Sequence, residues 1–222
     1  VRFVPTPMAL AVAVLTLACT GASWRALPRV RALVGVGTCL VVAASFFAAS
    51  SVATAAVADA LHRDAALLDV IVTPLPANPL CFTALTVERR GDYIARRATV
   101  ATWPALYPVE RCPDTEEHST AHFSASSTAD TGHVHWRGEY VAPLAELVAL
   151  YHDNCQAAAL LRFLRAPYWA IADDETLIIG DLRYDRSPGL DFSDVRIERR
   201  PSSCPAAVPS WIPPRRDLLG TD

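Results

Sequence analysis

The sequence predicts an α+β protein, in which an N-terminal transmembrane helical hairpin precedes an antiparallel sheet domain with a covering helix. Two apolar segments in the first sixty residues predict the hairpin, and β-branched and aromatic runs after residue 80 predict the sheet. An amphipathic stretch after Pro143 predicts the covering helix. The expected divisions are the hairpin (1–60), a juxtamembrane helix and proline-rich junction (61–80), the extramembrane domain (81–200) and a proline-rich tail (201–222).

The two apolar segments are long enough to cross a membrane. The first span is expected at about 4–20 and the second at 32–58, where no charged residue occurs. At about 1.5 Å per residue the second would form a helix near 40 Å long, which spans a bilayer with tilt. A buried core helix is the alternative for either segment, and the first also has the features of a signal peptide.

The basic residues Arg25, Arg29 and Arg31 lie between the two spans. Because positive loops stay in the cytoplasm, we expect a multi-pass protein of the inner membrane with its domain on the extracytoplasmic side. The chain begins with Val1 rather than Met, so we expect either a fragment of a longer protein or an alternative start codon. The net charge is −3, which gives no positive field for nucleic acid, so no nucleic-acid partner is predicted. The membrane is the predicted partner, and the sequence identifies no protein partner.

The segment 60–72 continues the helical periodicity, and a cluster of prolines after it is expected to end that helix. Two strands are then expected at 81–89 and 93–101, with Gly91 in the turn between them. The polar stretch 111–132 is expected to be a long loop.

From Pro143 onward, apolar residues recur every three or four positions, which predicts a helix that packs on a core. Arg162 and Arg165 near its end suit the helix dipole. Two more strands, 168–171 and 176–184, are expected to pair, and a last strand is expected at 190–199. We expect the tail from Pro201 to be extended or disordered.

Histidines provide the only candidate metal site. His118, His122, His133 and His135 lie close together in the sequence, and imidazoles are common zinc ligands. A solvated polar loop explains the same pattern. No motif identifies a catalytic residue, so the catalytic residues are unknown.

Two acidic clusters have structural interpretations. The run Asp173, Asp174 and Glu175 has the carboxylates of an acid–base pair, yet it lies where a hairpin needs turn residues. The stretch "GDLRYDR", from 180 to 186, is expected to form cross-strand ion pairs.

Cysteines provide a further constraint on the domain. Cys81, Cys112, Cys155 and Cys204 would lie in an oxidising compartment, where three pairings are possible.

Two stretches resemble a known family: "TPLPANPLCFTALTVERRGDYIAR" (73–96) and "LRFLRAPYWAIADDETLIIGDLRYD" (161–185). Together they resemble the C-terminal part of the YdjM-type, or LexA-binding, inner-membrane metal-dependent hydrolases. The resemblance implies a membrane-bound hydrolase that uses a divalent metal such as zinc. The family's motif His-x-His-Arg-Gly-x-Thr-His-Ser is absent from this chain, so no family ligand is assigned to any residue here.

Three hypotheses follow from the sequence. The chain is the C-terminal portion of a membrane-bound metal-dependent hydrolase, or a non-enzymatic membrane-anchored extracytoplasmic domain that has a binding or structural role. The third is a metal-binding loop formed by the four histidines.

Overall fold

The computed structural model describes most of the chain. The described residues are 6–24, 27–61, 65–76, 78–113, 122–172, 176–184, 192–207 and 215–220. They form an α+β protein with a long apolar N-terminal helix and antiparallel sheets. Arg25, His118, Asp173–Glu175 and residues 185–186, on which several predictions depend, lie outside this part.

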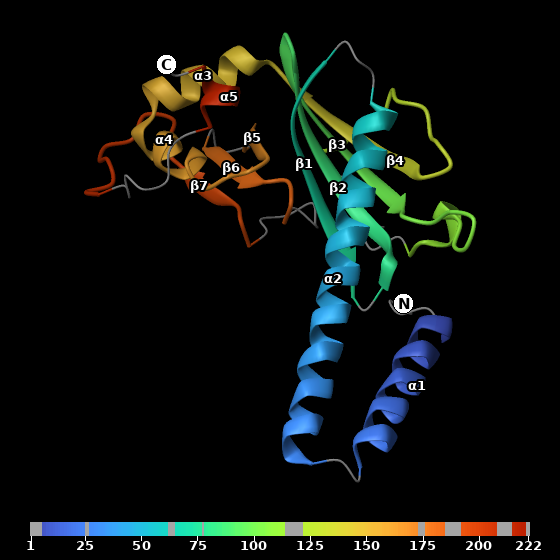
Figure 1. Ribbon diagram of the computed structural model, residues 1–222. Coiled ribbons are helices and arrows are strands. Elements are labelled where there is room, and N and C mark those ends of the chain that lie inside the picture. The colour runs from blue at the N-terminus through green and yellow to red at the C-terminus, as the bar shows by residue number, and fades with distance from the viewer. Residues whose placement is uncertain are drawn as a thin grey trace.

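Two apolar helices lie side by side at the N-terminal end (Figure 1). They are α1 (Thr6–Ser23) and α2 (Pro28–Ala60). Among the described residues α2 is the one helix long and apolar enough to cross a membrane, and no residue of its most apolar window is buried. A core helix of a soluble protein would be mostly buried, so the exposure argues against that interpretation of α2. The apolar part of α1 is shorter than a span requires, and the hairpin stays a prediction.

The large sheet contains four antiparallel strands in the order β1-β2-β3-β4. Their bounds are β1 Ala66–Leu75, β2 Asn78–Arg90, β3 Asp92–Ala101 and β4 Val134–Ala142. The predicted turn at Gly91 is confirmed, because β2 and β3 pair up to Arg90 and Asp92 on either side of it. Gly91 has φ of +80°, a conformation that glycine adopts without steric cost.

The predicted helix over 60–72 is wrong. Helix α2 ends at Ala60, and β1 begins at Ala66 and pairs with β2. The physical reason is the β-branched run Val70, Ile71 and Val72, which fits a half-buried pleated strand better than a helix. Helical periodicity and strand pairing compete in this short apolar stretch, and pairing with a neighbouring strand prevails.

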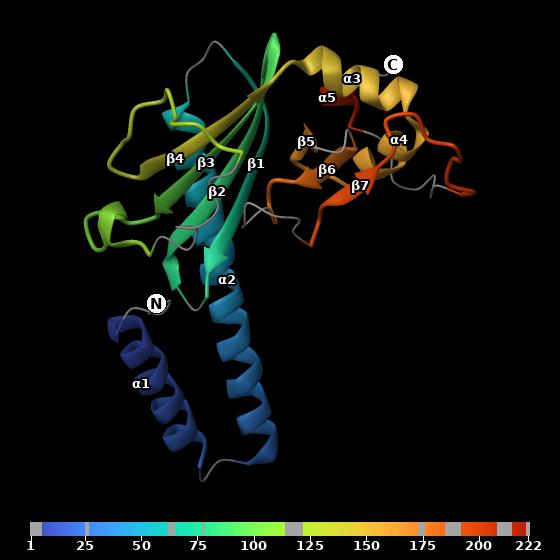
Figure 2. The same ribbon diagram turned by 180° about the vertical axis from the view of Figure 1, so that it is seen from behind.

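The end of α2 covers one face of the large sheet. Ala53 and Val57 are fully buried there, in a cluster with Phe82, Ala98 and Val134 from three different strands. Figures 1 and 2 show α2 continuing from this face, without a break, to the exposed segment beside α1. The same helix therefore supplies both the candidate span and part of the domain core.

Farther along this face the sheet holds a buried polar cluster. Arg96 forms an ion pair with Glu88, and its Nε donates to Glu139 at 3.0 Å. Thr86 donates its hydroxyl hydrogen to Glu88 at 2.7 Å. The two carboxylates thus have partners, as buried charges require.

The opposite face of the large sheet packs against a smaller unit. Its elements are α3 (Leu144–Asp153), α4 (Cys155–Leu161), β5 (Pro167–Ile171), β6 (Leu177–Asp181), β7 (Val195–Ile197) and α5 (Arg216–Leu219). Strands β5, β6 and β7 form a three-stranded antiparallel sheet. Leu147, Tyr168 and Leu182 of this unit share a buried cluster with Val87 and Tyr93 of the large sheet. Figure 2 shows the unit beside the large sheet, on the side away from α2.

Several predictions for this unit are refined. The pairing of β5 with β6 is confirmed, with Ile171 opposite Leu177. The expected single helix after Pro143 is two helices, which meet at Asn154. The expected strand over 190–199 is shorter in its described part, where it covers Val195–Ile197.

The tail was expected to be extended or disordered; residues 201–207 have no helix or strand, whereas 216–219 form α5, and the described part is anchored at two points. Cys204 is joined to Cys155 by a disulfide, and Leu218 and Leu219 of α5 are buried in the core cluster. The second disulfide joins Cys81 to Cys112, just after the 3₁₀ helix η1 (Val109–Arg111). Of the three pairings that the sequence allowed, the structure thus has one.

Candidate functional site

A groove on the small unit is the best candidate for a functional site. It has a volume of about 410 Å³ and lies between α3 and the sheet of β5 and β6. Its lining residues are Glu146, Ala149, Leu150, Asp153, Asn154, Trp169, Ile171, Leu177 and Arg199. Ligand sites are typically concave and apolar, with a few polar groups that fix orientation, and this groove has that composition.

The floor of the groove is apolar because of the strand register. Ile171 and Leu177 are paired across β5 and β6, so their side chains lie on the same face of the sheet. Leu177 is buried in a cluster with Ala157 and Ile179, whereas Ile171 is 62% exposed. An exposed isoleucine beside a buried leucine leaves apolar surface available to a ligand.

One wall of the groove carries negative charge. Glu146, Leu150 and Asp153 lie three or four positions apart on α3, so they share one side of that helix. Trp169 of β5 donates its indole N–H to Glu146 Oε2 at 3.1 Å, which fixes the carboxylate beside the ring. Arg199 also lines the groove. The lining thus contains two acidic residues and one arginine around an apolar floor.

Asn154 fixes the position of α3 relative to α4 and the end of β7. Its Oδ1 accepts hydrogen bonds from the backbone N–H groups of Gln156 and Ala157, both at 3.0 Å, which caps α4. Its Nδ2 donates to the carbonyl oxygens of Glu198 at 2.9 Å and Arg199 at 3.3 Å. The side chain is buried and fully used, so its role is to shape the groove rather than to bind a ligand. The preference of asparagine for N-caps is a sequence signal that could have predicted this helix break.

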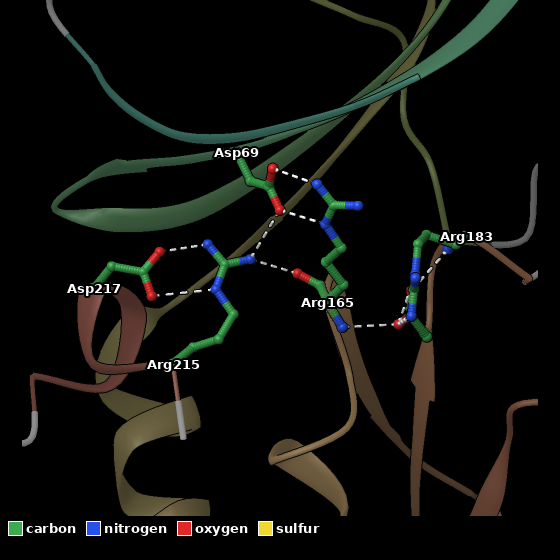
Figure 3. Close-up of polar contacts among 6 residues, drawn as sticks. Asp69, Arg165, Arg183, Arg215 and Asp217 are labelled. Carbon is green, nitrogen blue, oxygen red and sulfur yellow. Dashed lines mark hydrogen bonds and ion pairs between the residues drawn. The ribbon is translucent and has the colours of Figure 1, made fainter. Parts of the chain in front are cut away.

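An ion-pair network attaches the small unit to the large sheet (Figure 3). Arg165, in the loop before β5, makes a bidentate contact with Asp69 of β1, at 2.7 and 2.9 Å. Arg215 lies 3.5 Å from the same carboxylate, forms an ion pair with Asp217, and donates to the carbonyl oxygen of Arg165 at 2.6 Å. Arg165 was expected to complement a helix dipole, and it binds a carboxylate of a distant strand instead. The network joins three parts of the chain that are far apart in sequence.

A second carboxylate supports the same loop. Asp181 is 1% exposed, accepts the backbone N–H of Arg165 at 2.8 Å and forms an ion pair with Arg183 at 2.7 Å. The stretch "GDLRYDR" was expected to form cross-strand ion pairs, whereas the Asp181–Arg183 pair lies within one turn and joins residues two positions apart. Asp217 shows the electrostatic effect of the network, because hydrogen bonding to Arg215 lowers its pKa.

The three described histidines of the predicted metal site have different surroundings. The His122 ring stacks on Tyr168, with 4.4 Å between ring centroids. His133 Nδ1 lies 2.9 Å from the carbonyl oxygen of Ala101. His135 Nδ1 lies 3.6 Å from Asp130 Oδ2. Among the residues that the structure describes, no three His, Cys, Asp or Glu side chains are grouped to hold a metal ion. Since His118 lies outside this part, the four-histidine site remains a prediction.

The chain matches no protein-family model, no curated protein and no solved structure. The resemblance to YdjM-type hydrolases, and the metal-dependent activity that it implies, therefore remain predictions from the two sequence stretches. The groove was not predicted from the sequence, because its lining comes from four separate segments with no common motif.

Proposed function

We propose that the chain is a membrane-anchored binding domain on the extracytoplasmic side of the membrane. The continuity of α2 carries this proposal. Its apolar window is exposed, whereas Ala53 and Val57 near its end are buried against the large sheet. A single uninterrupted helix would therefore hold the domain in a fixed orientation to the bilayer.

Two features support the extracytoplasmic side. The Cys81–Cys112 and Cys155–Cys204 disulfides persist in oxidising compartments and are rare in the cytoplasm. Arg29 and Arg31 lie at the opposite end of α2, where the positive-inside tendency favours the cytoplasm. Redox chemistry and charge thus favour the same orientation.

Helix α1 supports a second pass. Cys19 Sγ on α1 lies 3.6 Å from Thr38 Oγ1 on α2, and small and hydroxyl side chains promote close packing of helices in membranes. We propose that α1 and α2 form a multi-pass hairpin that anchors the domain.

The groove supports a binding role. Its apolar floor would accept an aromatic or aliphatic group, and Glu146 and Asp153 would attract a positive charge beside Trp169. We propose that the ligand is a small amphipathic molecule with an apolar body and one positive charge.

Cysteine labelling in spheroplasts of a bacterial host tests the orientation. Asp92→Cys and Trp24→Cys would be introduced separately into a chain with Cys19 and Cys39 replaced by Ser. Asp92 is in the exposed turn of the large sheet, and Trp24 follows α1 at the other end. A membrane-impermeant maleimide should label D92C in intact spheroplasts and W24C only after lysis. The reverse pattern would contradict the proposed side.

Matched organic ions test the groove. We expect benzyltrimethylammonium to quench Trp169 fluorescence in the full chain at lower concentration than benzylsulfonate, which has a similar shape and the opposite charge. Glu146→Gln and Asp153→Asn should each weaken the binding of the cation, and Asp92→Asn, remote from the groove, should not. Equal responses to the two ions would refute the proposed ligand class.

A further inference from the structure

The loop after β3 has an apolar tip, which consists of residues 102–108. None of these residues is charged. Trp103 is 63% exposed and Leu106 is 62% exposed. Exposed apolar side chains that gather at one place mark sites of contact with a protein or a membrane.

The tip is held rigidly in this exposed form. The backbone N–H groups of Leu106 and Tyr107 donate to the Trp103 carbonyl oxygen at 3.0 and 2.9 Å. The Tyr107 hydroxyl donates to the carbonyl oxygen of Arg111 at 3.0 Å. The disulfide from Cys112 to Cys81 then ties the end of the loop to β2. The exposure of Trp103 is therefore part of the fold.

The contacts of Thr102 place the tip beside the anchor. Its backbone N–H donates to the Leu80 carbonyl oxygen at 3.0 Å, and its hydroxyl donates to the Pro79 carbonyl oxygen at 3.1 Å. Pro79 in turn lines a cleft together with Ser45 and Phe46 of α2. Figures 1 and 2 show this end of the large sheet facing α1 and the exposed part of α2.

We place the outer boundary of the bilayer near this level. Helix α2 carries its last basic residue at Arg31, and a hydrocarbon core of about 30 Å needs about 20 residues of helix, which from Ala32 extends to about Ser51. Phe47 lies about one helical turn before that point and is 77% exposed. Tryptophan and tyrosine side chains are enriched at such boundaries, because each has an apolar ring system and one polar group.

We propose that the tip inserts into the lipid interface, with Trp103 and Leu106 in contact with the bilayer surface that surrounds α2. This inference rests on the proposed membrane anchoring. The lack of charge in the tip and its connection to Pro79 favour lipid as the occupant. The contact would orient the domain and limit its rotation about α2.

Fluorescence quenching by lipid tests this proposal on the full chain. The protein would be reconstituted into phosphatidylcholine vesicles with or without bromine atoms on the acyl chains. Subtracting the signal of a Trp103→Phe variant from that of the wild type isolates Trp103, since the other tryptophans occur in both proteins. The matched control is Trp169→Phe, which isolates a tryptophan of the membrane-distal groove.

We expect brominated lipid to remove most of the Trp103 signal and little of the Trp169 signal. Equal quenching of the two, or an unquenched Trp103, would overturn the proposal and leave a partner other than lipid for the tip. Flotation of the vesicles in a density gradient at alkaline pH separates this failure from failure of the anchoring. A chain that floats with an unquenched Trp103 is anchored without insertion of the tip, whereas a chain that does not float is not anchored.

Discussion

The two sheets of this protein are stabilised by different kinds of contact. The large sheet packs apolar side chains against the end of α2, where Val57 is fully buried. The small sheet shares an apolar core with it, but its position also depends on the Asp69–Arg165 ion pair, the Asn154 side chain and the Cys155–Cys204 disulfide. Apolar packing is non-directional, whereas these contacts require particular atoms in particular places. Apolar packing thus attaches the large sheet to α2, and the directional contacts shape the groove.

Removal of the Cys155–Cys204 disulfide gives the largest expected effect. The bridge closes a loop with a sequence separation of 49, so the chain-entropy model predicts a loss of about 4 kcal/mol for C155S/C204S. Cys81–Cys112 closes a separation of 31, and a similar loss of about 4 kcal/mol is expected for C81S/C112S. Urea unfolding of the full chain in detergent, followed by near-ultraviolet circular dichroism, measures both.

Ligand binding distinguishes the two double variants. We expect C155S/C204S to lose benzyltrimethylammonium binding, because this bridge lies beside the groove, and C81S/C112S to keep it where the protein is folded. If both variants lost binding and unfolded in one transition with the whole chain, the two sheets would be a single cooperative unit and the comparison would fail.

Truncation of Val57 tests the apolar contact of the large sheet. Val57→Ala removes two buried methyl groups, and we expect it to lower the free energy of unfolding by about 2 kcal/mol. Val52 lies on the same helix and is 46% exposed, so Val52→Ala should cost less than about 0.5 kcal/mol. Both values come from the same urea titration in detergent. Equal costs would show that α2 does not pack on the sheet as described.

The elements that the sequence predicts well are those specified by neighbouring residues. The turn at Gly91 and the pairing of β5 with β6 have their turn residues and β-branched runs within a few positions. The exposed apolar helix α2 is predicted by composition alone. Over 60–72 helical periodicity competes with strand propensity, and pairing with a neighbouring strand determines the structure. That pairing cannot be identified from the sequence.

The groove and the ion pairs depend on contacts between distant residues. Asp69 and Arg165 are separated by 96 positions, and Trp169 and Glu146 by 23. No local pattern identifies such partners, because an exposed arginine and a paired arginine look alike in sequence. Asn154 is the exception, since its helix-capping role has a recognisable local signature.

Alkaline pH tests the aromatic contact between the sheets. Burial raises the pKa of Tyr140 to about 12, and its hydroxyl donates to the Trp169 carbonyl oxygen at 3.2 Å. In the unfolded chain the pKa of tyrosine is about 10, so the folded state holds the Tyr140 proton to higher pH. The stability that the protonated hydroxyl contributes is therefore complete below pH 10 and is lost as pH rises toward 12. At pH 11 the loss is about 1.4 kcal/mol.

The variant Tyr140→Phe isolates that effect. Its free energy of unfolding should be lower than that of the wild type. This difference should be constant around neutral pH and should narrow between pH 9 and 11. Rapid urea unfolding at each pH, with thiols blocked to prevent disulfide exchange, provides the measurement. If the difference in unfolding free energy stayed constant up to pH 11, the Tyr140 hydroxyl would lie in solvent rather than between the sheets.

The smallest expected effect is the coupling between Asp69 and Arg165. The Arg165 side chain is 47% exposed and that of Asp69 is 21% exposed, so solvent screens the attraction in spite of the bidentate geometry. A double-mutant cycle with Asp69→Asn and Arg165→Gln should give a coupling of about 1 kcal/mol. Arg215 also approaches Asp69, so Asp69→Asn alone should cost more than Arg165→Gln alone. The ion pair locates the small unit more than it stabilises it, and both single variants should therefore weaken benzyltrimethylammonium binding more than their unfolding free energies suggest. If binding were unchanged while stability fell, the network would stabilise the fold without shaping the groove.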